Sequence, residues 1–219
     1  MNKKIDLKQF EIFSELPIEI IENLLREHKI LKLKRGDFLY HVGDQANSLF
    51  LIQKGLLGLV VNTEKGGEHL LRLFRTGQFL GHRSLFAKEP YHASSMALED
   101  SEVIQIPAFC IERLMMKYPQ MAILFLKKLS SELKLAEQQR IAITERDVMC
   151  RVAEAILYIK QIDPDHAWTR KEIADFVGST GPTVTKILIK MNKKGLIRLK
   201  GRQIEIAQRS LLEKLCSGT

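Results

Sequence analysis

Residues 169–206 restrict the fold of this chain more than any other stretch. Residues 169–172 (Thr-Arg-Lys-Glu) have the form of a capping box, and the apolar positions that follow predict a short helix. Gly178 allows a tight turn, and apolar residues at helical spacing from Val184 predict a second helix. Two apolar runs around residues 200–202 (Lys-Gly-Arg) then predict a hairpin. Two short helices followed by a hairpin form a winged helix-turn-helix.

The predicted second helix and hairpin are strongly basic. Between Phe176 and Ile204 the sequence has seven Lys or Arg residues and no Asp or Glu. From Arg146 to the end, 14 Lys/Arg against 8 Asp/Glu give a net charge of +6, out of +8 for the chain. A basic run is often only a solvated surface, but this one coincides with the elements that would face a duplex, so it predicts DNA binding. The residues expected to contact DNA are Arg170, Thr180, Thr183, Thr185, Lys186, Lys190, Lys200 and Arg202.

Residues 29–106 have the pattern of a small β domain. Short alternating apolar runs are separated by turns that contain glycine, which predicts an antiparallel barrel or jelly roll. Residues before 29 are expected to be helical on both sides of Pro17. The predicted strands are Ile30–Leu33, Phe38–Tyr40, Leu49–Ile52, Leu56–Val61, His69–Phe74 and Val103–Ile106.

After Pro107 the periodicity becomes helical. Helices are predicted at 109–117, at about 120–143 and at 148–162, the last with Asp147 as its N-cap. The long helix has a narrow apolar stripe, typical of a coiled-coil seam, although such a helix can also pack on its own barrel. The stripe expected to form a dimer interface consists of Leu126, Leu129, Leu133, Ala136, Arg140 and Ile143.

The 219 residues are long enough for a core in each of two modest domains. We expect an α+β chain with a jelly roll and flanking helices at 1–118, a long helix at 119–146, and a winged helix-turn-helix at 147–219.

Several classes of protein are not expected. No apolar run could span a bilayer and no signal peptide is visible, so we expect a cytoplasmic protein that binds no membrane. Cys110, Cys150 and Cys216 are widely spaced, which argues against a disulfide framework, an iron–sulfur cluster or a zinc site. The histidines show no metal-ligand spacing, and no catalytic constellation stands out, so we expect neither a metal site nor an enzyme.

The glycine turns carry a family resemblance. Gly36-Asp37-x-Leu39-Tyr40-x-x-Gly43-Asp44, Leu49-Phe50-x-Ile52-x-x-Gly55 and Gly77-x-Phe79-x-Gly81 resemble the cyclic-nucleotide-binding domain. With the C-terminal motif, the whole chain resembles the Crp/Fnr family of bacterial transcription regulators. The resemblance implies a homodimer on a pseudo-palindromic DNA site, with half-sites about one helical turn apart and RNA polymerase as a further partner. The resemblance also implies that the jelly roll at 1–118 is a sensor and that residues 119–146 form a dimerisation helix and hinge. In such a regulator, a change in the barrel would rotate the DNA-binding domains about the hinge.

The residues that read cAMP in nucleotide-binding relatives are replaced here. Those relatives have a Glu for the ribose 2′-OH where this chain has His82, and an Arg for the cyclic phosphate where it has Tyr91 or His92. A pair that receives the adenine corresponds to Ala136 and Glu137. Losing the Arg alone would leave a buried anion unpaired, at a cost of roughly several kcal/mol. cAMP is therefore not expected as the effector.

A different effector and no effector both remain open, since Arg83 offers a substitute positive charge. The cysteine cluster that supports oxygen sensing in Fnr-like relatives is absent, so no iron–sulfur cluster is implied. The residues expected around an effector are His82, Arg83, Ser84, Leu85, Tyr91, His92, Ala93, Ala136 and Glu137.

The resemblance also predicts how DNA is read. Relatives commonly place Arg and Glu at Gly181 and Pro182, and Arg at Lys186, so a different target sequence is expected. Lys186 and Thr185 are candidates for base contacts, and the remaining residues of the DNA set are expected to contact phosphates. The alternative is a cyclic-nucleotide or small-anion receptor that signals through protein contacts, with the basic domain incidental.

Overall fold

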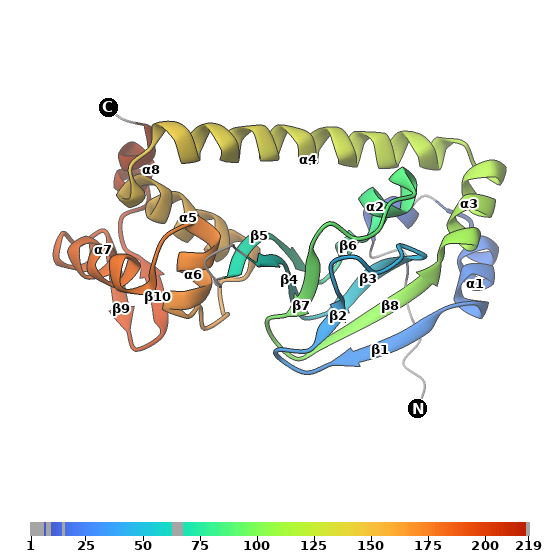
Figure 1. Ribbon diagram of the computed structural model, residues 1–219, viewed down its shortest axis with the longest axis horizontal. Helices are drawn as coiled ribbons and strands as arrows, with labels where there is room; N and C mark the ends of the chain where they lie inside the picture. The colour runs from blue at the N-terminus through green and yellow to red at the C-terminus, as the bar shows by residue number, and fades with distance from the viewer. Residues whose placement is uncertain (1–6, 8–9, 15, 63–67, 218–219) are drawn as a thin grey trace. The chain divides into compact units, whose positions relative to one another are not determined.

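The computed structural model describes residues 7, 10–14, 16–62 and 68–217 (Figure 1). The chain forms two compact units. The N-terminal unit consists of residues 1–60 and 73–133, and the C-terminal unit consists of residues 61–72 and 134–219.

Two four-stranded sheets form a jelly roll, which confirms the predicted fold. Their strand orders are β1-β8-β3-β6 and β2-β7-β4-β5, and the pairings β1–β8, β3–β8, β3–β6, β2–β7 and β4–β7 are antiparallel. The first sheet consists of β1 (Lys29–Leu33), β8 (Ser101–Pro107), β3 (Ser48–Lys54) and β6 (Phe79–Leu80). The second consists of β2 (Phe38–Tyr40), β7 (Ser94–Ala97), β4 (Leu56–Asn62) and β5 (Glu68–Arg75).

Strand β3 is buried on both faces. Because successive side chains of a strand point to opposite faces, Leu49 and Leu51 enter one hydrophobic cluster while Phe50 and Ile52 enter another. The first cluster contains residues of the helices that cover the sheet, and the second fills the interior of the roll. Strand β3 therefore belongs to both parts of the core.

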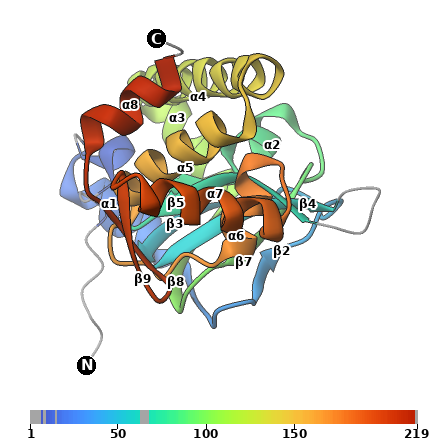
Figure 2. The same cartoon turned by 90° about the vertical axis from the view of Figure 1, so that its left-hand side faces the viewer.

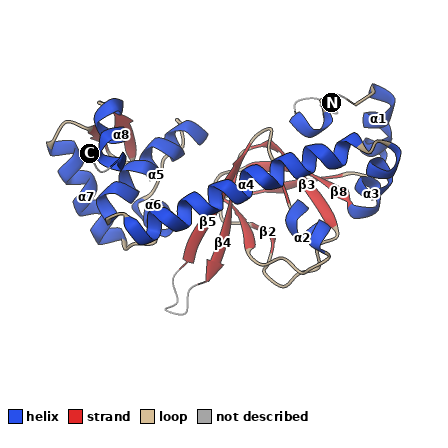
Figure 3. Cartoon of the chain, turned by 90° about the horizontal axis from the view of Figure 1, so that it is seen from above, coloured by secondary structure: helices blue, strands red, loops and turns tan. Residues whose placement is uncertain are grey.

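Helices cover one face of the first sheet. They include α1 (Ile18–Arg26), α3 (Ala108–Lys117) and the first half of α4 (Gln120–Glu145), which Figure 3 shows as one uninterrupted helix. The prediction of a helix before Pro17 is wrong for the described residues, because Glu11–Phe13 form only a 3₁₀ turn. Residues 1–6, 8–9 and 15 of that expectation lie outside the described part.

Three further elements of the N-terminal unit were not predicted: strand β6, helix α2 and strand β7. The stretch after Gly81, expected as a loop, contains the short helix α2 (His82–Ala87), bounded by left-handed residues at Gly81 and Lys88. Strand β7 has the sequence Ser-Ser-Met-Ala and lacks an apolar run, yet its backbone pairs with β2 and β4. Strand β7 therefore depends on pairing with its neighbours rather than on local propensity.

The C-terminal unit contains the predicted winged helix-turn-helix. Figure 2 faces this unit and shows α6 and α7 together with strand β9 of the wing. A final helix, α8, was not predicted; it buries Leu212 completely. The elements are α5 (Val148–Ile162), α6 (Arg170–Val177), α7 (Gly181–Lys193), β9 (Ile197–Lys200), β10 (Gln203–Ile206) and α8 (Arg209–Ser217).

Replacing Gly55 tests how tightly the roll is closed. Gly55 and Gly36 both have a left-handed backbone, with φ of +105° and +94°. A Cβ on Gly55 would lie 2.1 Å from Ser101 Oγ and 2.8 Å from Ser101 Cα, whereas a Cβ on Gly36 would meet nothing within 4 Å. We expect Gly36→Ala to lower the free energy of unfolding by roughly 1–2 kcal/mol, the cost of the strained backbone.

For Gly55→Ala we expect a loss of roughly 3 kcal/mol or more, because the clash with the Ser101 backbone adds to the strain. Urea unfolding of both variants measures the difference. Equal losses would show that β8 can move away from Gly55 without cost.

Candidate nucleic-acid interface and sensor pocket

The two helices of the helix-turn-helix begin and end at capped residues. The Thr169 side chain accepts a hydrogen bond from Glu172 N, and Glu172 Oε2 accepts one from Thr169 N at 2.8 Å, so the predicted capping box is present. Gly178 ends α6 with φ of 63°, a conformation that favours glycine. Thr180 then caps α7 by accepting from Thr183 N at 3.4 Å. These caps fix the turn that positions α7.

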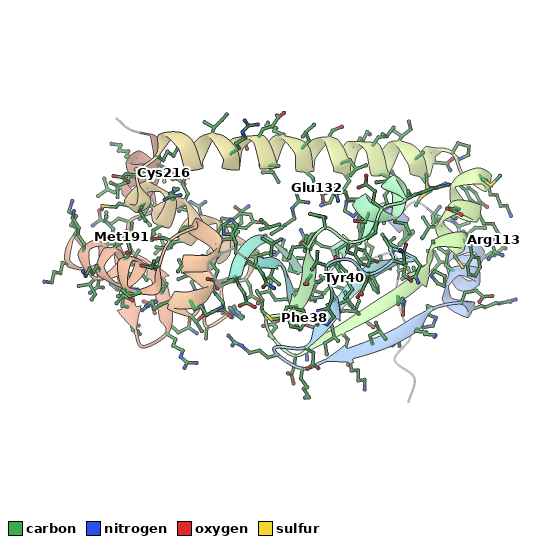
Figure 4. The ribbon with its side chains drawn as sticks, in the orientation of Figure 1. Phe38, Tyr40, Arg113, Glu132, Met191 and Cys216 are labelled. Atoms are coloured by element: carbon green, nitrogen blue, oxygen red, sulfur yellow. The ribbon has the colours of Figure 1, made fainter. Side chains whose placement is uncertain are left out.

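Helix α7 has a buried face and a basic face. Val184, Leu188 and Met191 are fully buried at the predicted spacing; Met191 is labelled in Figure 4. Lys186 and Lys190 are exposed. Because residues three and four apart share one face of a helix, burial of the apolar set presents these lysines to solvent.

The wing is attached to both helices of the motif. Asn192 Oδ1 of α7 accepts a hydrogen bond from Leu199 N at 3.1 Å, and Arg170 of α6 donates to Gly201 O at 3.5 Å. Gly201 lies between β9 and β10 with φ of 61°. These two hydrogen bonds fix the position of the wing relative to α6 and α7.

The predicted DNA contacts differ in how free their side chains are. Lys186 and Arg202 are exposed and make no ion pair with any residue that the structure describes. Lys200 is exposed but pairs with Glu205 at 2.9 Å. Both side chains of this pair remain exposed to solvent. Arg170 is half-buried against the wing, and burial lowers its pKa. Its position indicates a structural link as well as the expected phosphate contact.

The three threonine hydroxyls already have partners inside the motif. Thr185 donates to Gly181 O at 2.8 Å, within its own helix. The hydroxyls of Thr180 and Thr183 lie 2.9 Å apart. A base contact by Thr185 or a phosphate contact by the other two stays a prediction, and would use the lone pairs or the donor that these bonds leave over.

Two stacked tyrosines are part of the cluster that fills the interior of the roll. The rings of Tyr40 and Tyr91 stack with centroids 3.7 Å apart and an interplanar angle of 17°. Tyr91 is 5% exposed, and its hydroxyl donates to Ser48 O at 3.5 Å. Burial, and then the neighbouring Asp44 carboxylate, raise the pKa of Tyr91 to about 12. Burial also raises the pKa of Tyr40 far above its usual value.

His82 turns away from this interior. Its Nε2 lies 3.0 Å from Glu132 Oε2 of α4, and its ring meets the Phe79 ring edge-on with centroids 4.9 Å apart. His82 is 3% exposed and Glu132 is 8% exposed, and Lys128 Nζ lies 3.7 Å from the other Glu132 oxygen. Figure 4 labels Glu132 on the side of α4 that faces the strands. This buried polar pair connects α2 to α4.

Arg83 is held at the surface. Its guanidinium lies 2.9 Å from His92 Nδ1 and 3.6 Å from a Glu89 carboxylate oxygen. The side chain is 51% exposed. Arg83 and His92 are therefore brought together as expected, but their contact lies at the surface, with Glu89 as a further partner.

The remaining residues of the expected effector set are scattered. Leu85 is buried in the cluster beneath the helices, whereas Ala93 and Ser84 are buried without belonging to that cluster or to the interior one. Ala136 and Glu137 are exposed, in the part of α4 that belongs to the C-terminal unit.

The predicted dimer stripe is largely exposed. Leu126 is 58% and Leu133 is 62% exposed, Leu129 is half-buried, and Ala136 and Arg140 are exposed. The Ile143 side chain lies outside the described part. Exposed leucines at this spacing on a long helix leave an apolar strip in water, which a second helix could cover.

The described residues form neither a group of metal ligands nor a membrane-spanning helix. No three His, Cys, Asp or Glu side chains there are grouped to hold a metal ion. No described helix has the length and apolarity needed to cross a membrane.

Three contacts of this site were not predicted from the sequence. Asn192 holds the wing, Glu132 pairs with His82, and Tyr40 stacks on Tyr91. Tyr40 and Tyr91 are far apart in the sequence, as are His82 and Glu132, so no local spacing could have paired them.

Two family models match the chain. The model described as "Cyclic nucleotide-binding domain" matches residues 30–118, and that described as "Crp-like helix-turn-helix domain" matches residues 150–215. Both agree with the strand orders and with the winged motif. The chain belongs to the Crp/Fnr family of transcription regulators. It is a DNA-binding regulator of transcription, and its relatives are regulators rather than enzymes.

Relatives of this Crp/Fnr protein resemble it along most of their length. The fumarate and nitrate reduction regulatory protein of Escherichia coli (strain K12) is 24% identical over 216 residues, which cover 94% of this chain and 85% of the relative. The structure of FixK2 from Bradyrhizobium japonicum has a TM-score of 0.78 at 20% identity, covering 86% of this chain and 96% of that one. The c-di-GMP-responsive global regulator CLP of Xanthomonas campestris has a TM-score of 0.74 at 18% identity, covering 87% and 99%.

The buried tyrosines predict a loss of stability at alkaline pH. The pKa of Tyr91 is raised from 10.0 to about 12 in the folded state, so the unfolded chain releases this proton first. The stability contributed by the protonated phenol is present below pH 10 and is lost as pH rises from about 10 towards 12. We expect Tyr91→Phe to lose less stability over this range than the wild type.

Urea unfolding at a series of pH values measures this difference, and Tyr118→Phe, directly after α3 in the same unit, is the control. Identical pH dependence of the wild type and Tyr91→Phe would mean that the Tyr91 phenol ionises as readily in the folded state as in the unfolded one.

Proposed function

We propose that this Crp/Fnr regulator is a homodimer that binds a pseudo-palindromic DNA site through α7 and the wing. The observation that carries the proposal is the exposed, acid-free basic face of α7, with Lys186 and Lys190, beside the basic wing tip at Arg202. A helix N-terminus at Thr180 adds backbone N–H groups that favour a phosphate. Such a regulator acts in the cytoplasm, and RNA polymerase is its expected protein partner.

We further propose that cAMP is not its effector. The sequence offers Tyr91 or His92 at the position that pairs with the cyclic phosphate in nucleotide-binding relatives. The Tyr91 ring stacks on Tyr40 in the interior of the roll, and His92 contacts Arg83 at the surface. An anion placed at Tyr91 would meet a phenol and aromatic faces instead of a guanidinium. Binding would displace a packed ring and leave the phosphate without a charged partner, and both steps are unfavourable.

The alternative of a small-anion receptor that acts through protein contacts has less support. It would need Arg83 to be available for an anion, but the Arg83 guanidinium already contacts His92 and Glu89. The winged helix-turn-helix would also be without a role.

Selection of bound sequences from a random pool of DNA duplexes, with purified protein and no added ligand, tests the proposal. A palindromic consensus at moderate salt is the expected result, and it would show that the protein reaches its DNA-competent arrangement without an effector. Binding that is sensitive to salt but selects no consensus would contradict the effector-free form of the proposal.

Lys186→Ala tests base reading by α7. If Lys186 contacts a base edge, we expect a loss of roughly 1–3 kcal/mol on the selected site and a much smaller loss on scrambled DNA. Lys32→Ala removes the same charge from exposed β1 of the N-terminal unit and is the matched control. Fluorescence anisotropy at two salt concentrations measures both. Equal losses on specific and scrambled DNA would limit Lys186 to a phosphate contact.

Charges on the exposed stripe of α4 test the dimer. We expect Leu126→Asp combined with Leu133→Asp to convert the protein to a monomer, since each carboxylate would be buried in an apolar seam. Ile30→Asp on β1, which is 45% exposed, is the control for a surface charge and should remain dimeric. Sedimentation equilibrium gives the mass. If the protein with both stripe substitutions is still a dimer, the interface does not lie on this stripe of α4.

A further inference from the structure

Two cysteines from opposite ends of the C-terminal unit lie close together. Cys150 is in the first turn of α5 and Cys216 is in the last turn of α8. Helices α5 and α8 contact each other and lie side by side in Figure 1, and Cys216 is labelled in Figure 4. The unit therefore brings together two thiols that are widely separated in the sequence.

The hydrogen bonds of the two thiols limit the distance between Cys150 and Cys216. Cys150 Sγ donates to Leu215 O at 2.9 Å, and Leu215 directly precedes Cys216. In a trans peptide the carbonyl oxygen lies roughly 2.8 Å from the next Cα, so Cys150 Sγ is within roughly 6 Å of the Cys216 Cα. Cys216 Sγ donates to Leu212 O at 3.1 Å, along its own helix. Rotation of the two side chains, with a small approach of the helix end, would join the sulfurs.

A third group acts on both thiols. The Arg146 guanidinium is among the charges that act on both thiols, and it favours their ionised forms. Arg146 also pairs with Glu154 of α5. Burial outweighs the guanidinium and raises the pKa of both thiols, so they are protonated and slow to react at neutral pH. The pair thus lies where the predicted hinge, α5 and α8 meet.

We propose that Cys150 and Cys216 form a reversible intramolecular disulfide that fastens α8 to the first turn of α5. The oxidant is a low-molecular-weight disulfide. One cysteine thiolate attacks it to give a mixed disulfide and one small thiol, and the second thiolate then displaces the other small thiol. Two cysteine thiols and one small disulfide thereby become one protein disulfide and two small thiols.

The bond acts on the stability of the unit. It closes a loop that contains α6, α7 and the wing, and closing a long loop restricts the unfolded chain. Neither cysteine is on α7, β9 or β10, so the DNA-contacting face keeps its side chains. The inference does not rest on the proposed dimer or on the choice of effector.

Treatment of the purified full-length protein with oxidised glutathione tests the bond. We expect the wild type and Cys110→Ala to lose about two mass units per chain, the mass of two hydrogens, with one cross-linked peptide pair spanning Cys150 and Cys216. Cys110 is the matched control, because it is buried in the N-terminal unit. Cys150→Ser should instead gain one glutathione on Cys216, and Cys216→Ser should gain one on Cys150. A wild type that gains glutathione, or that links only between chains, would overturn the proposal.

A second readout needs no serine variant. We expect the oxidised wild type to unfold at a temperature about 5 °C or more above the same sample after dithiothreitol. Because burial raises both thiol pKas, the rate of ring closure should rise about tenfold per pH unit near neutrality. An unchanged unfolding temperature would show that the bond does not fasten α8, and a rate independent of pH would contradict thiolate attack.

Discussion

The burial of both faces of β3 is the constraint on which the N-terminal unit depends. One strand supplies Leu49 and Leu51 to the layer beneath the helices and Phe50 and Ile52 to the interior of the roll. Neither layer can form without the other, because a strand with two apolar faces exposes one of them unless it is covered on both. Strand β8 has the same double role through Val103 on one side and Ile104 on the other. Packing of α1, α3 and α4 on the sheet is thus part of the condition for the roll to close.

Tyr91 and His82, which the family resemblance suggests for nucleotide-reading positions, are both packed in the core. Tyr91 adds its ring to the interior cluster, and His82 points into the helical layer to meet Glu132. A buried polar pair of this kind is a poor source of stability compared with apolar side chains of the same volume. It does, however, favour one arrangement of α2 on α4, since any other would leave a buried imidazole or carboxylate without its partner. The His82–Glu132 contact therefore helps to fix the position of α2 on α4.

Much of the fold could be predicted because its signals are local. Alternating apolar runs with glycine corners, the capping box at Thr169 and the helical spacing from Val184 each depend on a few adjacent residues. The elements that could not be predicted depend on distant ones. The backbone of β7 pairs with two strands although its sequence carries no apolar run, and α8 owes its place to Leu212 packing in the core. At the site, the exposed lysines of α7 follow from helical spacing, whereas Glu132 reaches His82 across 50 residues.

The C-terminal unit meets a different constraint, because a domain this small buries little apolar surface. Its DNA-facing side must stay exposed and basic, so α7 can offer only one face to the core. The remaining stability has to come from contacts outside the core. These are the helix caps at Thr169 and Thr180, the hydrogen bond from the wing to Asn192, and the packing of α8 on α5. Helix α8 packs against α5, and Arg146 lies just before the start of α5. A covalent bond between Cys150 and Cys216 would therefore reinforce the unit without using any of the surface that DNA requires.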